Sequence, residues 1–174
     1  MHISEGVLSA PVLISGVVLA GTGLAIGLKK MEYDRVPEVA LLAAAFFVAS
    51  LIRIPLGPSS CHLALSGAIG VLLGWSVFPA IVVGLTLQAL LFQFGGLTTL
   101  GVNTVIMALP ALVCCFLFNG LCRSSCSALA SAASFACGFL SIALGTLLMA
   151  LALVTTGKHF SEIAVSIIIA HLPL

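Results

Sequence analysis

Long apolar runs separated by short polar or glycine-containing segments dominate the pattern along the chain. A helix needs about 20 mostly apolar residues to cross the hydrocarbon core of a bilayer. The runs cover 7–28, 37–54, 61–74, 77–94, 103–121 and 126–154, and a last apolar stretch covers 162–174. The pattern predicts an all-α, polytopic membrane bundle of six or seven transmembrane helices, in a single transmembrane domain over residues 1–174.

Two of these runs are too short to span a bilayer securely. Residues 61–74 follow the polar approach GPSSCHL and predict a tilted or partly buried helix, which other helices would have to cover. Residues 162–174 stop at HLPL, so we expect the C-terminal helix to be cut off there.

Composition supports a membrane chain. Hydrophobic residues make up 61% of the sequence and charged residues only 6%, whereas soluble domains carry about 25% charged residues. The net charge of +1 gives no reason to expect nucleic-acid binding. The first lysine, Lys29, follows the first apolar run, which is the reverse of a cleaved signal peptide. We therefore expect a retained first helix with its N-terminus outside.

The basic residues support this orientation, because cytoplasmic loops carry an excess of Lys and Arg. With the N-terminus outside, four basic residues fall on the cytoplasmic side and two fall outside. The four are Lys29, Lys30, Arg35 and Arg123, and the two are Arg53 and Lys158. The same threading brings four distant segments to the outer side: the N-terminus, RIPLGPSSCHL, GGLTTLGVN and GKHF.

Small residues repeat at three- and four-residue spacing in the first predicted helix. They are Gly16, Ala20, Gly23 and Gly27. Small residues let helix backbones approach closely, which drives packing in lipid. The stripe predicts either a tight internal bundle or a docking face for another membrane subunit.

His2, directly after the N-terminal residue, is a candidate metal chelator. The amine of Met1, the amide nitrogen of His2 and its imidazole Nδ1 can close a five-membered and a six-membered ring around one ion. Such a nearly coplanar set of nitrogens suits Ni²⁺ and Cu²⁺, and a neutral imidazole is a common fourth ligand. The alternative is that His2 is a polar residue in an exposed tail.

His62 is the candidate fourth ligand, because ionisable residues at membrane depth are rare and usually functional. We expect it at the outer end of a helix, after a loop with Gly57 and Pro58. A hydrogen bond to a neighbouring helix is an equal alternative. Cys61 could compete as a thiolate, but adjacent residues on a helix point about 100° apart.

Three further residues are candidates for a second shell or a lid. Glu5 could orient the second nitrogen of His2, although a cap for a helix beginning at Gly6 or Val7 is a simpler role. The segment FQFGGLTTLGVN could form a lid, in which Gly101 permits a turn and Asn103 supplies an amide. Alternatively, this segment is a plain connection and Asn103 caps the next helix.

Other reactive residues indicate little further chemistry. Cysteines in apolar runs usually behave as small hydrophobes, and Cys122 and Cys126 have one-turn helical spacing that could hold a metal. The sequence has no Ser/His/Asp set, no HExxH motif and no pair of intramembrane carboxylates. We therefore expect neither an enzyme nor a bound cofactor.

The motifs MHISEG, SSCHL, GGLTTLGVN and HLPL together resemble the CbiM/NikM family. These are the substrate-binding membrane subunits of energy-coupling-factor (ECF) ABC transporters for cobalt and nickel. The resemblance spans nearly the whole chain and implies Co²⁺ or Ni²⁺ as the transported ion. It also implies that Met1, His2 and His62 are the metal ligands, with GGLTTLGVN as a cover.

The resemblance further implies partners and a location. The expected partners are a transmembrane coupling subunit of the EcfT/CbiQ type, ATPase subunits of the CbiO type that hydrolyse the ATP, and a small CbiN-type accessory membrane subunit. The expected location is a bacterial or archaeal cytoplasmic (inner) membrane. Gln93 and Phe94 depart from the pattern, since the resemblance predicts a His there. The alternatives are an ECF subunit for an organic vitamin, or a structural or enzymatic membrane bundle.

Overall fold

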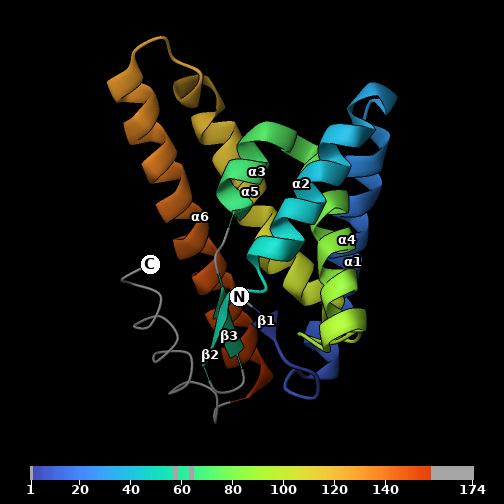
Figure 1. Ribbon diagram of the computed structural model, residues 1–174. Helices are drawn as coiled ribbons and strands as arrows, with labels where there is room; N and C mark the ends of the chain where they lie inside the picture. Colours follow the sequence, from blue (N-terminus) through green and yellow to red (C-terminus); the bar gives the residue numbers. More distant parts are fainter. Residues whose placement is uncertain (1, 57–58, 63–64, 158–174) are drawn as a thin grey trace.

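The computed structural model describes residues 2–56, 59–62 and 65–157, with residues 53–56 and 59–62 described by their backbone. Within these ranges the chain forms a helical bundle with a small sheet at one end (Figure 1). The helices are α1 (Ala10–Lys29), α2 (Val36–Ala49), α3 (Ser66–Leu73), α4 (Val77–Phe92), α5 (Leu100–Cys122) and α6 (Ser127–Thr156), with short 3₁₀ turns η1 (Tyr33–Arg35) and η2 (Gly74–Ser76). The strands are β1 (His2–Ile3), β2 (Arg53–Leu56) and β3 (Ser59–His62).

The helices confirm a multi-pass membrane bundle. Four segments in the described part of the chain are long and apolar enough to cross a membrane: Ala10–Lys29, Ser66–Phe92, Leu100–Cys122 and Ser127–Thr156. The second of these combines α3, η2 and α4, and α2 has only 14 residues. The count of six or seven spanning helices stays a prediction, and the stretch 162–174 lies outside the described residues.

The small sheet was not predicted, and it changes the bounds of two predicted helices. The 37–54 run divides, because α2 ends at Ala49 and β2 begins at Arg53. The run predicted as a helix over 61–74 becomes helical only at Ser66. Pro55 explains the first change, since proline lacks the N–H that a helix interior needs. It lies in β2, an edge strand of the order β1-β3-β2, where proline is tolerated.

The small-residue stripe of α1 packs inside the bundle. Gly16, Ala20, Gly23 and Gly27 are the buried residues of α1. A Cβ built on Gly16 would lie 2.3 Å from Cγ2 of Val102 and 2.8 Å from its backbone nitrogen. Within the described bundle, these residues therefore serve close helix packing, which favours the internal alternative over a docking face.

The segments predicted to share one side of the membrane do meet at one end of the bundle. This site end carries β1, β2, β3, the 93–99 loop and the last turn of α6 (Figure 1). The backbone N–H of Ser9 donates to Oγ1 of Thr156 at 3.3 Å, which joins the start of α1 to the end of α6. Of the segment GKHF, Gly157 is described and the remainder lies outside the described residues.

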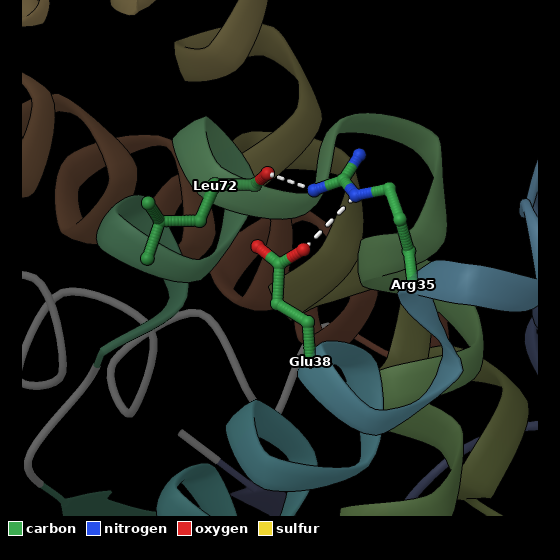
Figure 2. A network of polar contacts seen from close by, with 3 residues as sticks. All are labelled: Arg35, Glu38 and Leu72. Carbon is green, nitrogen blue, oxygen red and sulfur yellow. Dashed lines mark hydrogen bonds and ion pairs between the residues drawn. The ribbon is translucent and has the colours of Figure 1, made fainter.

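The opposite, basic end of the bundle contains the connections α1–α2, α3–α4 and α5–α6. Figure 2 shows how Arg35, in the α1–α2 connection, is bonded to the last turn of α3 and to the first turn of α2. Its Nη2 donates to the carbonyl of Leu72 and its Nε to Oε2 of Glu38, both at 2.9 Å. The hydrogen bond from Arg35, with added attraction from Arg35 and Arg123, holds the pKa of the Glu38 carboxyl below its ordinary value. The guanidinium of Arg35, at the last turn of α3, also complements the dipole of that helix.

Candidate metal site

The N-terminal strand places His2 inside the bundle. β1 pairs with β3 in antiparallel register, so that His2 lies opposite Ser60 and Ile3 opposite Ser59. His2 is only 4% exposed and Ile3 is fully buried. The interpretation of His2 as an exposed tail residue is therefore wrong.

Asn103 of α5 holds the other edge of β1. Its Oδ1 accepts a hydrogen bond from the backbone N–H of Ile3 at 2.9 Å, and its Nδ2 donates to the backbone carbonyl of Ile3 at 3.1 Å. The amide thus satisfies the two backbone groups that a neighbouring strand would otherwise pair. Asn103 is 2% exposed. Because β3 lies along one edge and Asn103 along the other, the position of His2 is fixed from both sides.

The same amide ties β1 to the glycine turn in the 93–99 loop. Nδ2 of Asn103 also donates to Oγ1 of Thr99, and that hydroxyl donates to the carbonyl of Gly96, both at 3.2 Å. Gly95 has φ +77°, and a Cβ built on it would lie 3.0 Å from Nδ2 of Asn103 and 3.4 Å from Cδ2 of His2. The loop therefore covers the imidazole closely, and its glycines permit that approach.

Glu5 fastens this loop to the N-terminal segment from outside. Its backbone N–H donates to the carbonyl of Gly95 at 3.0 Å, and its Oε1 accepts from the backbone N–H of Thr98 at 3.2 Å. The prediction that Glu5 caps a helix is wrong, since α1 begins at Ala10 with Ser9 as its N-cap. The residues between them form a turn instead of a helix.

Two other predicted roles in the GGLTTLGVN segment also change. Asn103 lies in the first turn of α5 and Thr99 is the N-cap residue, so the interpretation of Asn103 as a cap is wrong. Gly101 belongs to the helix, and a Cβ built on it would lie 2.7 Å from the backbone nitrogen of Val17. Gly101 therefore lets α5 approach α1 and is not a turn residue of the lid.

His62 and Met1 are the two candidate ligands that the described side chains do not include. Met1 lies outside the described residues, and His62 is described by its backbone. The prediction that His62 lies at the end of a helix is wrong, because β3 ends at His62 and α3 begins at Ser66. Cys61 also lies in β3, so the helical geometry used to separate Cys61 from His62 does not apply to them.

One buried polar pair behind the site was not predicted from the sequence. Gln88 and Ser50 are both fully buried, and Nε2 of Gln88 donates to Oγ of Ser50. This hydrogen bond joins the end of α2, which leads into β2, to the last turns of α4, which lead into the 93–99 loop. A glutamine within an apolar run is the signal that could have revealed it, because polar groups inside a membrane bundle need partners.

The described residues contain no group of three or more His, Cys, Asp or Glu side chains that could hold a metal ion. The five described cysteines are free thiols. Cys122 ends α5 and Cys126 precedes α6, so the two do not share the one-turn helical spacing that their separation suggested. The imidazole of His2, enclosed by β3, Asn103 and the glycine turn, remains the candidate around which a site could form.

Replacing Asn103 by Leu is expected to destabilise the N-terminal strand. The change removes both hydrogen bonds to Ile3 and leaves two buried backbone groups unsatisfied, at a cost of about 2–4 kcal/mol. Hydrogen–deuterium exchange should show faster exchange at Ile3. The matched control is Asn119→Leu, near the other end of α5, because the buried Oδ1 of Asn119 has no hydrogen-bond partner in the described part of the chain. Equal exchange in the two variants would contradict the role assigned to Asn103.

Comparison with known sequences gives one family match over nearly the whole chain. The profile of the cobalt uptake substrate-specific transmembrane region, CbiM, matches residues 2–174.

Individual relatives are metal transport proteins by name. A Haemophilus influenzae metal transport protein is 52% identical over 119 residues, which cover 68% of this chain and 58% of the relative. A Methanocorpusculum labreanum fused cobalt transport protein, CbiMQ, is 37% identical over 68% of this chain and 21% of its own length. A Rhodobacter capsulatus fused nickel transport protein, NikMN, is 38% identical over 62% of this chain and 33% of its own. The chain thus spans less than two thirds of each of these relatives.

A solved structure supports the fold. The crystal structure of a transition metal transporter superposes with a TM-score of 0.80 at 23% identity, covering 100% of this chain and 85% of that one. At this identity, the similarity shows the shared fold alone.

Proposed function

The chain belongs to the CbiM family, the cobalt uptake substrate-specific transmembrane region, and on that premise we propose that it captures Co²⁺ or Ni²⁺ through its N-terminal residues. The ligands are the amine of Met1, the amide nitrogen and imidazole Nδ1 of His2, and the imidazole of His62. Binding through the amide nitrogen releases its proton, and four nitrogens then surround the ion. Planar nitrogen sites of this kind suit Ni²⁺, and imidazole ligands suit several divalent transition metals.

The observation that carries the proposal is the burial of His2 on a strand paired with β3. His62 lies two positions from Ser60, the residue opposite His2. Positions two apart share one face of a sheet, and such diagonal neighbours on adjacent strands lie about 7–8 Å apart. The proposal assigns both imidazoles to one ion, with metal–nitrogen bonds of about 2 Å.

The rigidity of the segment also supports a binding role. Asn103 fixes Ile3, the residue after the chelate, and the Gly95–Gly96 turn closes over His2. A chelate held by packed and hydrogen-bonded neighbours loses less freedom when the ion binds. In this proposal Asn103 and Glu5 hold the site and its lid, while Gly101 acts through packing against α1.

The distribution of basic residues supports an orientation with the site outside. Lys29, Lys30, Arg35 and Arg123 all lie at the basic end, and an excess of Lys and Arg is typical of cytoplasmic loops. The N-terminus would then face the outside of the bacterial or archaeal cytoplasmic membrane, where the ion is captured for uptake.

The partners in this proposal are those of an ECF transporter. The fused CbiMQ and NikMN relatives support association with a CbiQ-type coupling subunit and a small CbiN-type subunit. ATP hydrolysis is assigned to CbiO-type ATPase subunits, so the chain itself is not the enzyme. An ECF subunit for an organic vitamin is the alternative, and its pocket would not require a free amine at Met1.

Metal content tests the proposal. The purified chain, exposed to Co²⁺ or Ni²⁺ and then desalted, should retain one ion per chain by mass spectrometry of the metals, and the two ions should compete for that position. A chain that retains neither ion, or retains an organic molecule instead, would contradict the proposed function.

A further inference from the structure

A hollow of about 430 Å³ opens next to the N-terminal segment at the site end. Its walls include Glu5, Gln93 and the Gly95–Gly96 turn. The same Gly95 lies against His2, since a Cβ built on it would come within 3.4 Å of the imidazole Cδ2. The glycine turn is therefore a thin wall shared by the hollow and the buried histidine.

The carboxylate of Glu5 is fixed within this hollow. Its Oε1 accepts the backbone N–H of Thr98, and its side chain lies flat against Gly96, where an added Cβ would come 2.6 Å from Cγ of Glu5. Glu5 is nevertheless exposed to solvent. The carboxylate of Glu5 is therefore held in place by a backbone N–H and is still exposed to water, so it is available to bind a ligand.

Glu5 is the only charged residue at the site end among the side chains that the structure describes. The other described carboxylates, on Glu32, Asp34 and Glu38, lie at the basic end with the four described cations. An exposed carboxylate on an apolar bundle attracts cations.

Gln93 adds a neutral polar group beside this carboxylate. It is the only residue other than glycine with a positive φ in the described chain, at 55°. This left-handed conformation is unfavourable for a residue with a side chain, and its N–H caps α4 by donating to the carbonyl of Gln88. Strained residues of this kind often occur at functional sites, and Gln93 lines the hollow.

We infer that the hollow is an entry site, in which a hydrated divalent transition-metal cation binds through its water ligands to Glu5 and Gln93 before it reaches His2. Six waters at about 30 Å³ each occupy about 180 Å³, so the hydrated ion fits. The carboxylate and the amide oxygen accept hydrogen bonds from the bound waters. The ion then exchanges waters for the nitrogen ligands once the glycine turn moves. This inference rests on the proposed function of the His2 site.

The variant Glu5→Gln separates charge from structure. Glutamine keeps an oxygen that can accept the N–H of Thr98, and it removes the negative charge. In stopped-flow mixing of the full chain with Co²⁺ or Ni²⁺, the association rate constant should fall about fivefold at low ionic strength. The dissociation rate should stay within about twofold, and added salt should reduce the difference between variant and parent chain. Glu38→Gln, an exposed carboxylate at the basic end, is the matched control and should bind at the parent rate.

Hexaamminecobalt(III) provides a second probe, because its ligands do not exchange during the measurement and it cannot enter a nitrogen chelate. It should slow metal capture by the parent chain and have little effect on the Glu5→Gln variant. Capture by Glu5→Gln at the parent rate, or equal slowing of both chains by hexaamminecobalt(III), would overturn the entry site alone. A variant that differs only in its dissociation rate would also overturn it, since Glu5 would then support the bound ion. A parent chain that binds no metal would overturn the proposed function together with the entry site.

Discussion

His2→Ala is expected to abolish retention of Co²⁺ and Ni²⁺ by the purified chain. The change removes the imidazole that closes the six-membered chelate ring, so that the amine and the amide of residue 2 would have to hold the ion without it. Loss of an outer-shell partner alone typically weakens metal binding by 10–100-fold, and loss of a direct ligand should exceed about 100-fold. Equilibrium titration of the variant with each ion measures the effect.

The variant must remain folded for this result to be informative. β1 is held through the backbone of Ile3 by Asn103, and this contact does not depend on the side chain of residue 2. The helical circular dichroism signal and the thermal transition in detergent should therefore stay close to those of the parent chain. A folded His2→Ala protein with normal metal stoichiometry would show that the ion is held elsewhere.

His62→Ala should weaken binding by a similar factor, whereas Cys61→Ser should change it by less than about threefold. The two residues are neighbours on β3, and alternate positions on a strand face opposite sides of the sheet. The proposed site uses His62 and not Cys61. The comparison is internally controlled, because both substitutions disturb the same strand.

The opposite ranking of these two variants would identify a thiolate site. Thiolates favour softer metal ions than imidazoles do, so the preferred ion would change as well. Titration of both variants with Co²⁺, Ni²⁺ and Zn²⁺ distinguishes the two outcomes.

The assembly of the site end was predictable from the sequence because it depends on topology. Once the runs are threaded through a bilayer with Lys29 and Arg123 inside, the N-terminus, the SSCHL segment and the glycine-rich segment must share one side. The structure brings these segments together through β1, β3 and the 93–99 loop. The small-residue stripe of α1 was likewise recognisable from its spacing, although its packing against Val102, Phe78 and Trp75 was needed to distinguish the internal alternative.

The strands were not predictable from apolar periodicity. A short apolar run does not distinguish a buried helix from a strand, and the RIPLGPSSCHL segment adjoins runs that continue as helices. Pro55 and the Gly57–Pro58 pair were the available signals against a continuous helix. Gly57 and Pro58 predict a loop before His62, whereas the pairing of β3 with β1 joins residues about 60 positions apart.

The contacts of Asn103 and Glu5 could not be derived from the sequence either. Asn103 lies near the start of α5, where a capping role is the ordinary expectation for asparagine. Its actual partner, Ile3, is 100 residues away. Glu5 similarly binds the N–H of Thr98 in place of the nearby helix. In both residues a short polar side chain satisfies backbone groups that only the folded bundle brings within reach.

Acetylation of the N-terminus tests the central claim most directly, because it removes the amine ligand and leaves every side chain of the bundle unchanged. The chain beginning with a free amine at Met1 and the same chain acetylated there are loaded with Co²⁺ or Ni²⁺, desalted and measured for metal by mass spectrometry. The N-terminal chelate predicts about one ion per chain with the free amine and essentially none after acetylation. Equal metal content in the two preparations would contradict the chelate and would leave His2 as a buried structural residue.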